Sequence, residues 1–277
     1  MANGRPSVVS RQYNTPLPTV EMNFLYSSML VLLGVSLGYA SLIAHSRVAE
    51  GEEAKRGQFP YQVALTLKRQ TVCGGVMVHE RFFLTAAHCF FKGETPVPVE
   101  ELNVFYGSEK LFFGGKYNRV KTVHFHEEYD HGFKYDLALV EVKRKFEFSF
   151  TAKPVAFGVE TFGESQPATV SGYGRATVEG NMVFRLKYAE LTSLSDAECR
   201  EATGDNYYEG VFCMDTTAGA GLCMGDYGGP AVANQTLVGV GSYTVGGNCG
   251  EGQPDVFVDV GHFSSWVQSK LEPETEE

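Results

Sequence analysis

The sequence predicts an all-β protein that ends in a helix, and two patterns support this. Short runs rich in Val, Tyr, Phe and Thr recur along the chain and are cut by glycines. Such runs with turn residues between them are typical of β-sandwiches and β-barrels. Clear examples are residues 62–67, 120–125 and 237–241. Between His262 and Leu271, by contrast, the apolar residues fall at helical spacing, which predicts a terminal helix packed on the body.

A second, shorter helix is predicted near position 195. Ser195 is followed three residues later by Glu198. This spacing forms a capping box, in which each side chain can bond the backbone N–H of the other residue. We therefore expect a short helix that begins after Ser195.

The N-terminal part of the chain contains a long apolar run from Phe24 to Ala44. Small residues near Ala40 suit cleavage by signal peptidase, so we expect residues 1–40 to be a signal-peptide region, with Met22 as an alternative start. A retained membrane anchor is the alternative, because the run approaches the length that spans a bilayer. Serines within the run favour the cleaved signal, which predicts a secreted protein with no membrane association after cleavage.

Composition narrows the classes of partner. The 277 residues include 23 basic and 33 acidic side chains, a formal charge of −10. Nucleic acid is excluded as a partner, because phosphate binding needs a concentrated positive face. Six cysteines, an even number, agree with a secreted protein in an oxidising compartment. The chain ends in an acidic tail at residues 272–277.

Three motifs follow one another in a fixed order. His88 lies in the run Leu84–Cys89, Asp136 begins the run Asp136–Val140, and the turn Gly225-Asp226-Tyr227-Gly228-Gly229-Pro230 comes last. This order resembles the chymotrypsin/trypsin-like serine protease family from Arg47 to about Leu271. The resemblance implies two six-stranded antiparallel β-barrels with the site in the cleft between them. It assigns residues 48–271 to a trypsin-like domain and leaves 41–47 as a short propeptide.

The resemblance also implies a catalytic triad, and one of its members is altered. By motif, His88 is the general base, Asp136 orients it, and the N–H groups of Gly225 and Tyr227 form the oxyanion hole. Tyr227 stands where the family has its nucleophilic serine. A phenol oxygen lies a whole ring further from the backbone than a serine oxygen, so we expect a degenerate triad without proteolytic activity. The alternative is a weakly active trypsin-like endopeptidase that uses Tyr227 or a water activated by His88.

In this family the six cysteines form three disulfides. The pairing that the resemblance implies is Cys73–Cys89, Cys199–Cys213 and Cys223–Cys249. The count alone allows fifteen pairings.

Arg47 and Val48 occupy the position at which the family is activated by cleavage. In active relatives the new amine pairs with the aspartate of the glycine-rich turn, here Asp226. The alternative is that the bond after Arg47 is merely accessible, and that Asp226 caps its own turn.

The specificity pocket is expected to contain Gly221, Thr244 and Asp255. Gly221 matches the floor position where trypsins have aspartate, and Asp255 matches a deeper wall position that could attract a basic side chain. Thr244 replaces a glycine of the rim and is expected to narrow the entrance. The alternative for Asp255 is a loop carboxylate that faces solvent.

Two further patterns carry weaker signals. Three histidines lie among carboxylates, a composition that suits zinc: His124, His126 and His131. The resembled family has a surface loop here that leads to the orienting aspartate and contains His126, so we expect no metal and no cofactor. Asn234-Gln235-Thr236 is an N-glycosylation sequon between two strand runs.

The function predicted from the sequence is a secreted, non-catalytic homologue of serine proteases that acts by binding. It is expected to be a monomer with a protein partner, namely an active protease, a substrate or an inhibitor. Homologues without the serine are common in arthropods, in immune cascades and reproductive fluids. A storage protein is a third possibility, but no repeat or composition bias supports it.

Overall fold

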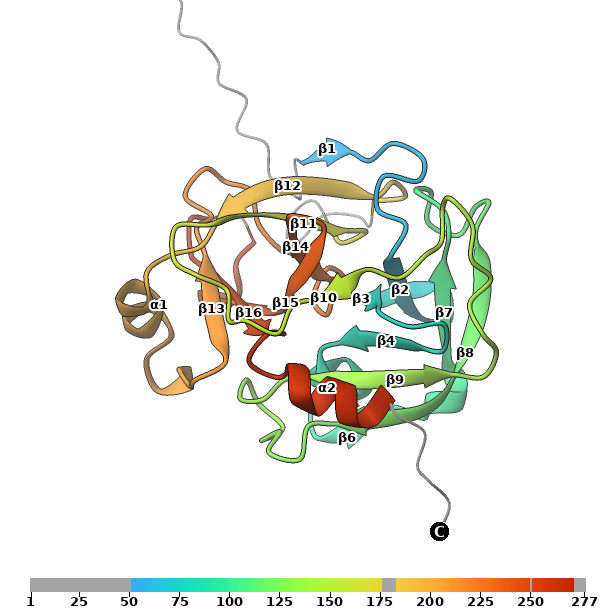
Figure 1. The fold of residues 1–277 in the computed structure, drawn as a ribbon, viewed down its shortest axis with the longest axis horizontal. Helices are drawn as coiled ribbons and strands as arrows, with labels where there is room; N and C mark the ends of the chain where they lie inside the picture. The colour runs from blue at the N-terminus through green and yellow to red at the C-terminus, as the bar shows by residue number, and fades with distance from the viewer. Residues whose placement is uncertain (1–50, 176–182, 250, 272–277) are drawn as a thin grey trace, which may run out of the picture. The chain divides into compact units, whose positions relative to one another are not determined.

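The structure is a computed structural model, and we describe residues 51–175, 183–249 and 251–271 of it (Figure 1). The predicted signal region 1–40, the propeptide 41–47, the bond between Arg47 and Val48, and the tail 272–277 lie outside these residues. All described residues belong to one compact unit. Within them, no helix is both long enough and apolar enough to cross a bilayer.

The first half of the described chain forms a closed, six-stranded barrel, as expected. Its strands, in the order in which they pair, are β2 (Gln62–Leu67), β3 (Gln70–Met77), β4 (Phe82–Thr85), β9 (Ala138–Val142), β8 (Lys116–Phe125) and β7 (Leu102–Tyr106). The strand predicted at 62–67 is confirmed, and the one at 120–125 is the second half of β8. Between β4 and β7 in the chain, β5 (Phe91–Lys92) and β6 (Thr95–Pro96) form a separate two-stranded sheet.

The second half forms an eight-stranded sheet, and its closure into the expected second barrel is not shown. Its strands pair in the order β1 (Glu52–Glu53), β12 (Lys187–Thr192), β11 (Pro167–Gly172), β14 (Pro230–Ala233), β15 (Thr236–Thr244), β16 (Asp255–Asp259) and β13 (Val211–Met214), and β10 (Ala156–Phe157) pairs with β15. The residue after β12, Ser193, meets Met214 of β13 in one isolated bridge. Two hydrogen bonds form this bridge, from the Leu194 N–H to the Cys213 carbonyl and from the Asp215 N–H to the Thr192 carbonyl.

Both predicted helices are present. Helix α1 (Asp196–Thr203) begins after Ser195, and its capping box with Glu198 is formed in both directions. Helix α2 (Ser264–Leu271) lies at the C-terminal end and buries Val267 against the second sheet. Single 3-10 turns occur at Ala87–Phe90, Val99–Glu101, Gly204–Asn206 and Val245–Gly247.

Apolar clusters fill both halves and the seam between them. Side chains such as Leu65 and Val140 pack inside the closed barrel, and Val170 and Phe257 pack inside the second sheet. A third cluster joins strands from both halves, because Leu139 of β9 packs in the same cluster as three valines of the second half, Val240, Val258 and Val267. This shared core fixes the halves against each other and so fixes the loops that meet between them.

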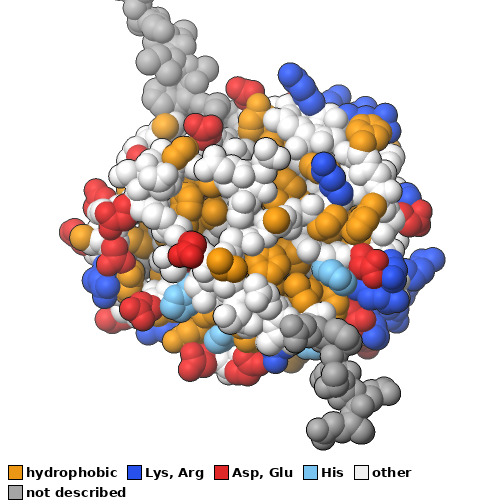
Figure 2. Space-filling model, viewed as in Figure 1, with side chains coloured by type: hydrophobic (Ala, Val, Ile, Leu, Met, Phe, Trp, Pro, Cys, Tyr) orange, Lys and Arg blue, Asp and Glu red, His pale blue; other side chains and the backbone are white. Residues whose placement is uncertain are grey.

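Charged side chains of both signs are interspersed on the surface. Figure 2 shows Lys and Arg gathered on the side of the molecule where β7 and β8 lie, on the face that is viewed there. Several of these cations are paired on the surface, for example Lys116 with Glu147 and Lys121 with Glu141. Pairs this exposed contribute little to stability, because water and salt screen them.

Candidate active site

Three loops bring the predicted triad positions together. His88 lies in the 3-10 turn Ala87–Phe90 directly after β4, and Asp136 lies two residues before β9. Tyr227 lies in the turn that leads into β14. Because β4 and β9 are paired neighbours in the barrel, His88 and Asp136 emerge side by side, and the shared core places Tyr227 opposite them.

His88 and Asp136 form a tight, directed pair. The Nδ1 atom of His88 lies 2.8 Å from Oδ2 of Asp136, and the His88 backbone N–H donates to Oδ1, also at 2.8 Å. Asp136 is fully buried. Burial lowers the pKa of His88, but the charge and the hydrogen bond of Asp136 raise it further, so the net pKa lies above its usual value. The carboxylate thus fixes Nδ1 as the donor. The other ring nitrogen, Nε2, lies 3.9 Å from the sulfurs of both Cys73 and Cys89.

Ser242 completes this pair, and sequence reasoning gave it no role. Its hydroxyl donates to Oδ2 of Asp136 at 2.5 Å, and both residues are buried. Ser242 lies on β15, far along the chain from Asp136. The only signal in the sequence is its place directly before Tyr243 and Thr244 in the rim of the pocket.

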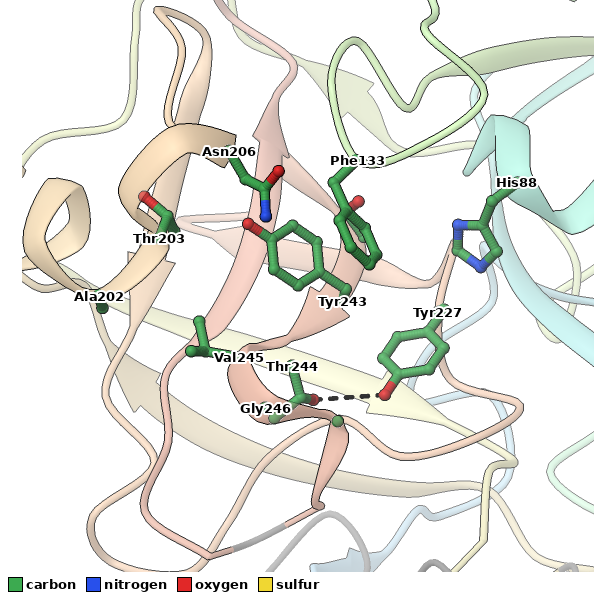
Figure 3. Close-up of a pocket in the computed structure, with 12 residues that line it drawn as sticks. His88, Phe133, Ala202, Thr203, Asn206, Tyr227, Tyr243, Thr244, Val245 and Gly246 are labelled. Atoms are coloured by element: carbon green, nitrogen blue, oxygen red, sulfur yellow. Dashed lines mark hydrogen bonds between the residues drawn. The ribbon is translucent and has the colours of Figure 1, made fainter. Parts of the chain in front are cut away.

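The Tyr227 side chain points away from His88. Its hydroxyl donates to Oγ1 of Thr244 at 3.4 Å, and Figure 3 shows the oxygen directed toward Thr244. The rings of Tyr227 and His88 meet edge to face with centroids 5.9 Å apart. Among the described residues, the phenol oxygen has no hydrogen bond to His88. Burial raises the pKa of Tyr227 above its usual value of 10, which further disfavours the phenolate.

The three predicted pocket residues lie together behind this ring. Thr244 donates to Oδ1 of Asp255 at 2.6 Å, and the Leu222 N–H donates to Oδ2 at 2.5 Å. A side chain on Gly221 would collide with the same carboxyl, since a Cβ there would lie 2.7 Å from Oδ2. Asp255 is fully buried, so the alternative of a solvent-facing carboxylate is wrong. Burial raises the pKa of Asp255 to about 7.

The glycine-rich turn keeps the geometry expected of an oxyanion hole. Gly225 has φ +99°, a conformation that side chains rarely adopt. Its N–H and that of Tyr227 have no acceptor among the described residues. Two donors without an acceptor at one turn suit a carbonyl oxygen of a bound chain.

Asp226, inside the same turn, is buried and bonded to the backbone. It accepts the N–H of Gly174 at 2.6 Å and that of Cys223 at 3.1 Å. Burial is the main cause that raises its pKa to about 7. The bond from the Cys223 N–H means that Asp226 caps its own turn, which is one of the two roles that the sequence analysis left open for it. Pairing with the amine of Val48 involves a residue outside the described part of the chain and stays a prediction.

Two hollows extend from the triad positions, and His88 and Tyr227 line both. The first has a volume of about 600 Å³ and lies between α1, the loop at Phe133 and the end of β15 (Figure 3). Phe133 stacks on Tyr243 at its wall, with ring centroids 4.2 Å apart. The second has a volume of about 730 Å³ and lies between the β2–β3 hairpin and the turn at Gly225. Open space therefore remains on both sides of Tyr227.

The remaining predicted site residues are placed as follows. The three disulfides join the expected partners, Cys73–Cys89, Cys199–Cys213 and Cys223–Cys249. Asn234 is exposed at the two-residue tip of the β14–β15 hairpin. Its glycosylation stays a prediction.

Of the three histidines that lie among carboxylates in the sequence, His126 and His131 contact aromatic rings, and His124 lies on strand β8. His126 stacks on Tyr135, with ring centroids 5.2 Å apart, and also contacts Trp266. His131 meets Phe91 edge to face at 4.9 Å. The one cluster of metal-ligand types found among the described residues joins His88 to Cys73 and Cys89. Those two sulfurs are bonded to each other, so they offer no thiolate to a metal.

Comparison with known proteins decides the family. The family model described as Trypsin matches residues 48–267. The chain belongs to the trypsin family. It is 34% identical to Serine protease SP24D of Anopheles gambiae over 87% of each chain, and 30% identical to Chymotrypsin-2 of Vespa crabro over 80% of this chain and 98% of that one.

A solved structure shows the same fold. Mouse neuropsin, described as a serine protease expressed in the limbic system of the brain, superposes with a TM-score of 0.73. The match is 26% identical and covers 80% of this chain and 99% of that one. Neuropsin and the two relatives are all named as proteases, and none of these names describes a binding role.

Proposed function

We propose that this member of the trypsin family is a secreted, non-catalytic homologue. It acts by binding a protein partner, as a regulator or cofactor of extracellular proteolysis. One observation supports this most strongly: the hydroxyl at the nucleophile position bonds Thr244, inside the pocket, rather than His88. A base without a nucleophile cannot start acyl transfer.

The displacement of the hydroxyl is large on the scale that matters for catalysis. An error of about 1 Å in placing a reacting group can cost roughly 100-fold in rate. Here the oxygen lies at the far end of a ring and on the side away from the base (Figure 3). The Tyr227 ring also lies between the cleft and Asp255, where a substrate side chain would enter.

The parts of the site that bind a chain are retained. The cleft extends on both sides of Tyr227, and the N–H groups of Gly225 and Tyr227 lack an acceptor among the described residues. The three disulfides support an extracellular setting, because cytosolic thiols are kept reduced. These features suit a protein that holds a partner without cleaving it.

The test is labelling with a fluorophosphonate probe, which reacts with activated serines whatever the substrate side chain. The natural protein, Tyr227→Ser and Tyr227→Ala are compared, each before and after cleavage following Arg47. We expect labelling of the Ser variant alone. The Ala variant is the matched control, because it opens the same space without supplying a hydroxyl.

Turnover of peptide substrates is measured on the same samples. Hydrolysis by the natural protein, lost in Tyr227→Ala, would overturn the proposal in favour of a weakly active endopeptidase. Labelling of the Ala variant would show that the probe also reacts outside the cleft. In that case a peptide inhibitor is added, and the label that it prevents in the Ser variant but not in the Ala variant is the label in the cleft.

A further inference from the structure

The hollow beside the β2–β3 hairpin, which we call the arginine groove, combines two arginines with apolar side chains. Its lining contains no carboxylate among the described residues. It consists of Arg69, Gln70, Thr71, Val72, His88, Phe112, Arg175, Phe184, Met224, Gly225 and Tyr227. Phe184 and Met224 expose 61% and 47% of their surface there. An open groove that combines arginine with exposed apolar side chains suits a polypeptide better than a small polar ligand.

Arg69 is held at this groove by an unusual backbone. It forms the tip of the two-residue β2–β3 hairpin with Lys68, and both have positive φ, 49° and 64°. Hairpin tips of this type usually carry Asn or Gly, because other side chains are strained there. Phe112 also has a positive φ, 65°, and the Arg69 guanidinium lies 5.8 Å from the centre of its ring. Lys68, Arg69 and Phe112 thus all adopt a disfavoured backbone conformation. Together they place the Arg69 guanidinium against the Phe112 ring at the wall of the groove.

Within the described part of the chain, no acidic side chain neutralises the charge of Arg69. No carboxylate of the described residues forms an ion pair with it, although the chain carries a net charge of −10. Its neighbour Lys68 does pair, with Glu101 at 3.7 Å, and does not line the groove. Contact with an aromatic face orients a guanidinium but leaves its five donors available to a carboxylate.

We propose that the arginine groove binds an extended segment of a protein partner that carries a glutamate or aspartate next to an apolar side chain. The carboxylate pairs with Arg69, and the apolar side chain packs on Phe184 and Met224. This inference rests on the proposed binding function and adds to it the chemical class of the partner. Recognition at this groove therefore depends on acidic residues of the partner. The pocket behind Tyr227 differs, because it contains Asp255 and would suit a basic side chain.

The side-chain hydroxyl of Thr71 offers a hydrogen bond to the backbone of the bound segment. It follows Gln70 on β3 and lines the groove, and its hydroxyl is buried without a hydrogen-bond partner among the described residues. Buried hydroxyls are almost always satisfied in native proteins. Because this oxygen has no exposed surface, a peptide N–H or C=O in the groove reaches it only if the Thr71 side chain turns into the groove.

The experiment measures binding of a labelled peptide, Gly-Phe-Glu-Glu-Gly, to the whole protein by fluorescence anisotropy. The matched neutral probe is Gly-Phe-Gln-Gln-Gly. We expect the acidic peptide to bind more tightly and its affinity to fall as salt is raised. Arg69→Asn should weaken it roughly three- to tenfold. Asparagine suits the positive φ of position 69, so this variant is expected to fold.

Lys68→Asn is the matched control, because it removes the same charge from the same hairpin tip outside the groove. Unchanged affinity in this variant, with loss in Arg69→Asn, supports the assignment. Equal binding of the two peptides, no binding, or an equal loss in both variants would overturn it. Self-association in the ultracentrifuge that disappears on deleting residues 272–277 and in Arg69→Asn would also overturn it, since the acidic tail of a second copy would then be the occupant.

The two proposals fail in different ways. Labelling or turnover by the natural protein would remove the non-catalytic function and leave the peptide affinities unaffected. Equal affinities for the two peptides would remove the acidic partner and leave the labelling result unaffected.

Discussion

Tyr227 connects two sites that are separate in an active protease of this fold. Its backbone N–H stays in the turn that would hold an oxyanion, while its side chain reaches Thr244 in the pocket. Thr244 in turn donates to the buried carboxyl of Asp255 at 2.6 Å. The two hydrogen bonds differ in strength, because the second is short and involves a buried acid while the first is long, at 3.4 Å.

This difference predicts unequal costs for removing the two hydroxyls. Thr244→Val keeps the shape of the side chain but leaves Asp255 with one fewer donor, so it should lower the free energy of unfolding by about 2 kcal/mol. Tyr227→Phe should cost less than about 1 kcal/mol. Urea unfolding at neutral pH measures both. Equal losses would contradict this prediction, because they would mean that the phenol bond stabilises the protein as much as the bond from Thr244 to Asp255 does.

Sequence reasoning located the residues of the site but not their orientations. His88, Asp136 and Tyr227 could be found because each lies in a motif of fixed local sequence. The direction of the Tyr227 ring and the bond from Ser242 to Asp136 could not, because both depend on β15. Contacts between residues so far apart in the chain leave no local pattern to read.

At the scale of elements, the strands and helices were predicted best where the pattern is local. The capping box of α1 and the strand at 62–67 are both present as expected. Closure of the second sheet into a barrel was also predicted, and the strand pairing does not show it. It depends on the register between β12 and β13, which lie on either side of α1 in the chain and meet at the single bridge of Ser193 with Met214. Hydrophobic alternation fixes which face of a strand is buried but not whether two end strands form a ladder.

Helix α1 forms one wall of the hollow in Figure 3, through Ala202 and Thr203, so its start affects the cleft. The Ser195 hydroxyl accepts the N–H of Glu198 at 3.3 Å, and Glu198 accepts the N–H of Ser195 at 2.9 Å. Ser195→Ala should therefore lower the free energy of unfolding by about 1 kcal/mol, measured by urea denaturation. Ser195→Asn should be close to neutral, because asparagine caps as well as serine does. A similar loss in both variants would show that another contact of Ser195 is responsible.

At the scale of the whole molecule, two buried carboxyls connect stability to pH. Burial raises the pKa of both Asp226 and Asp255 to about 7, above the unfolded value of about 4. A raised carboxyl pKa means that the folded state binds the proton more tightly than the unfolded state does. The contribution of these groups to stability is therefore full below pH 4 or so, and it is lost as the pH rises through about 7.

Cleavage after Arg47 should change this dependence at one of the two groups only. If the amine released at Val48 pairs with Asp226, its positive charge lowers the pKa of that carboxyl and removes the proton that the folded state gains there. Between about pH 5 and about pH 7, stability of the uncleaved protein should fall with a slope that is steeper by up to about 1.4 kcal/mol per pH unit than that of the cleaved protein. Urea unfolding of both forms across this range measures the slopes. Asp226→Asn should flatten the curve of the uncleaved protein by the same amount, whereas Asp255→Asn should flatten both curves equally. Parallel curves before and after cleavage would show that the new amine does not reach Asp226, and that this carboxyl serves only to cap its own turn.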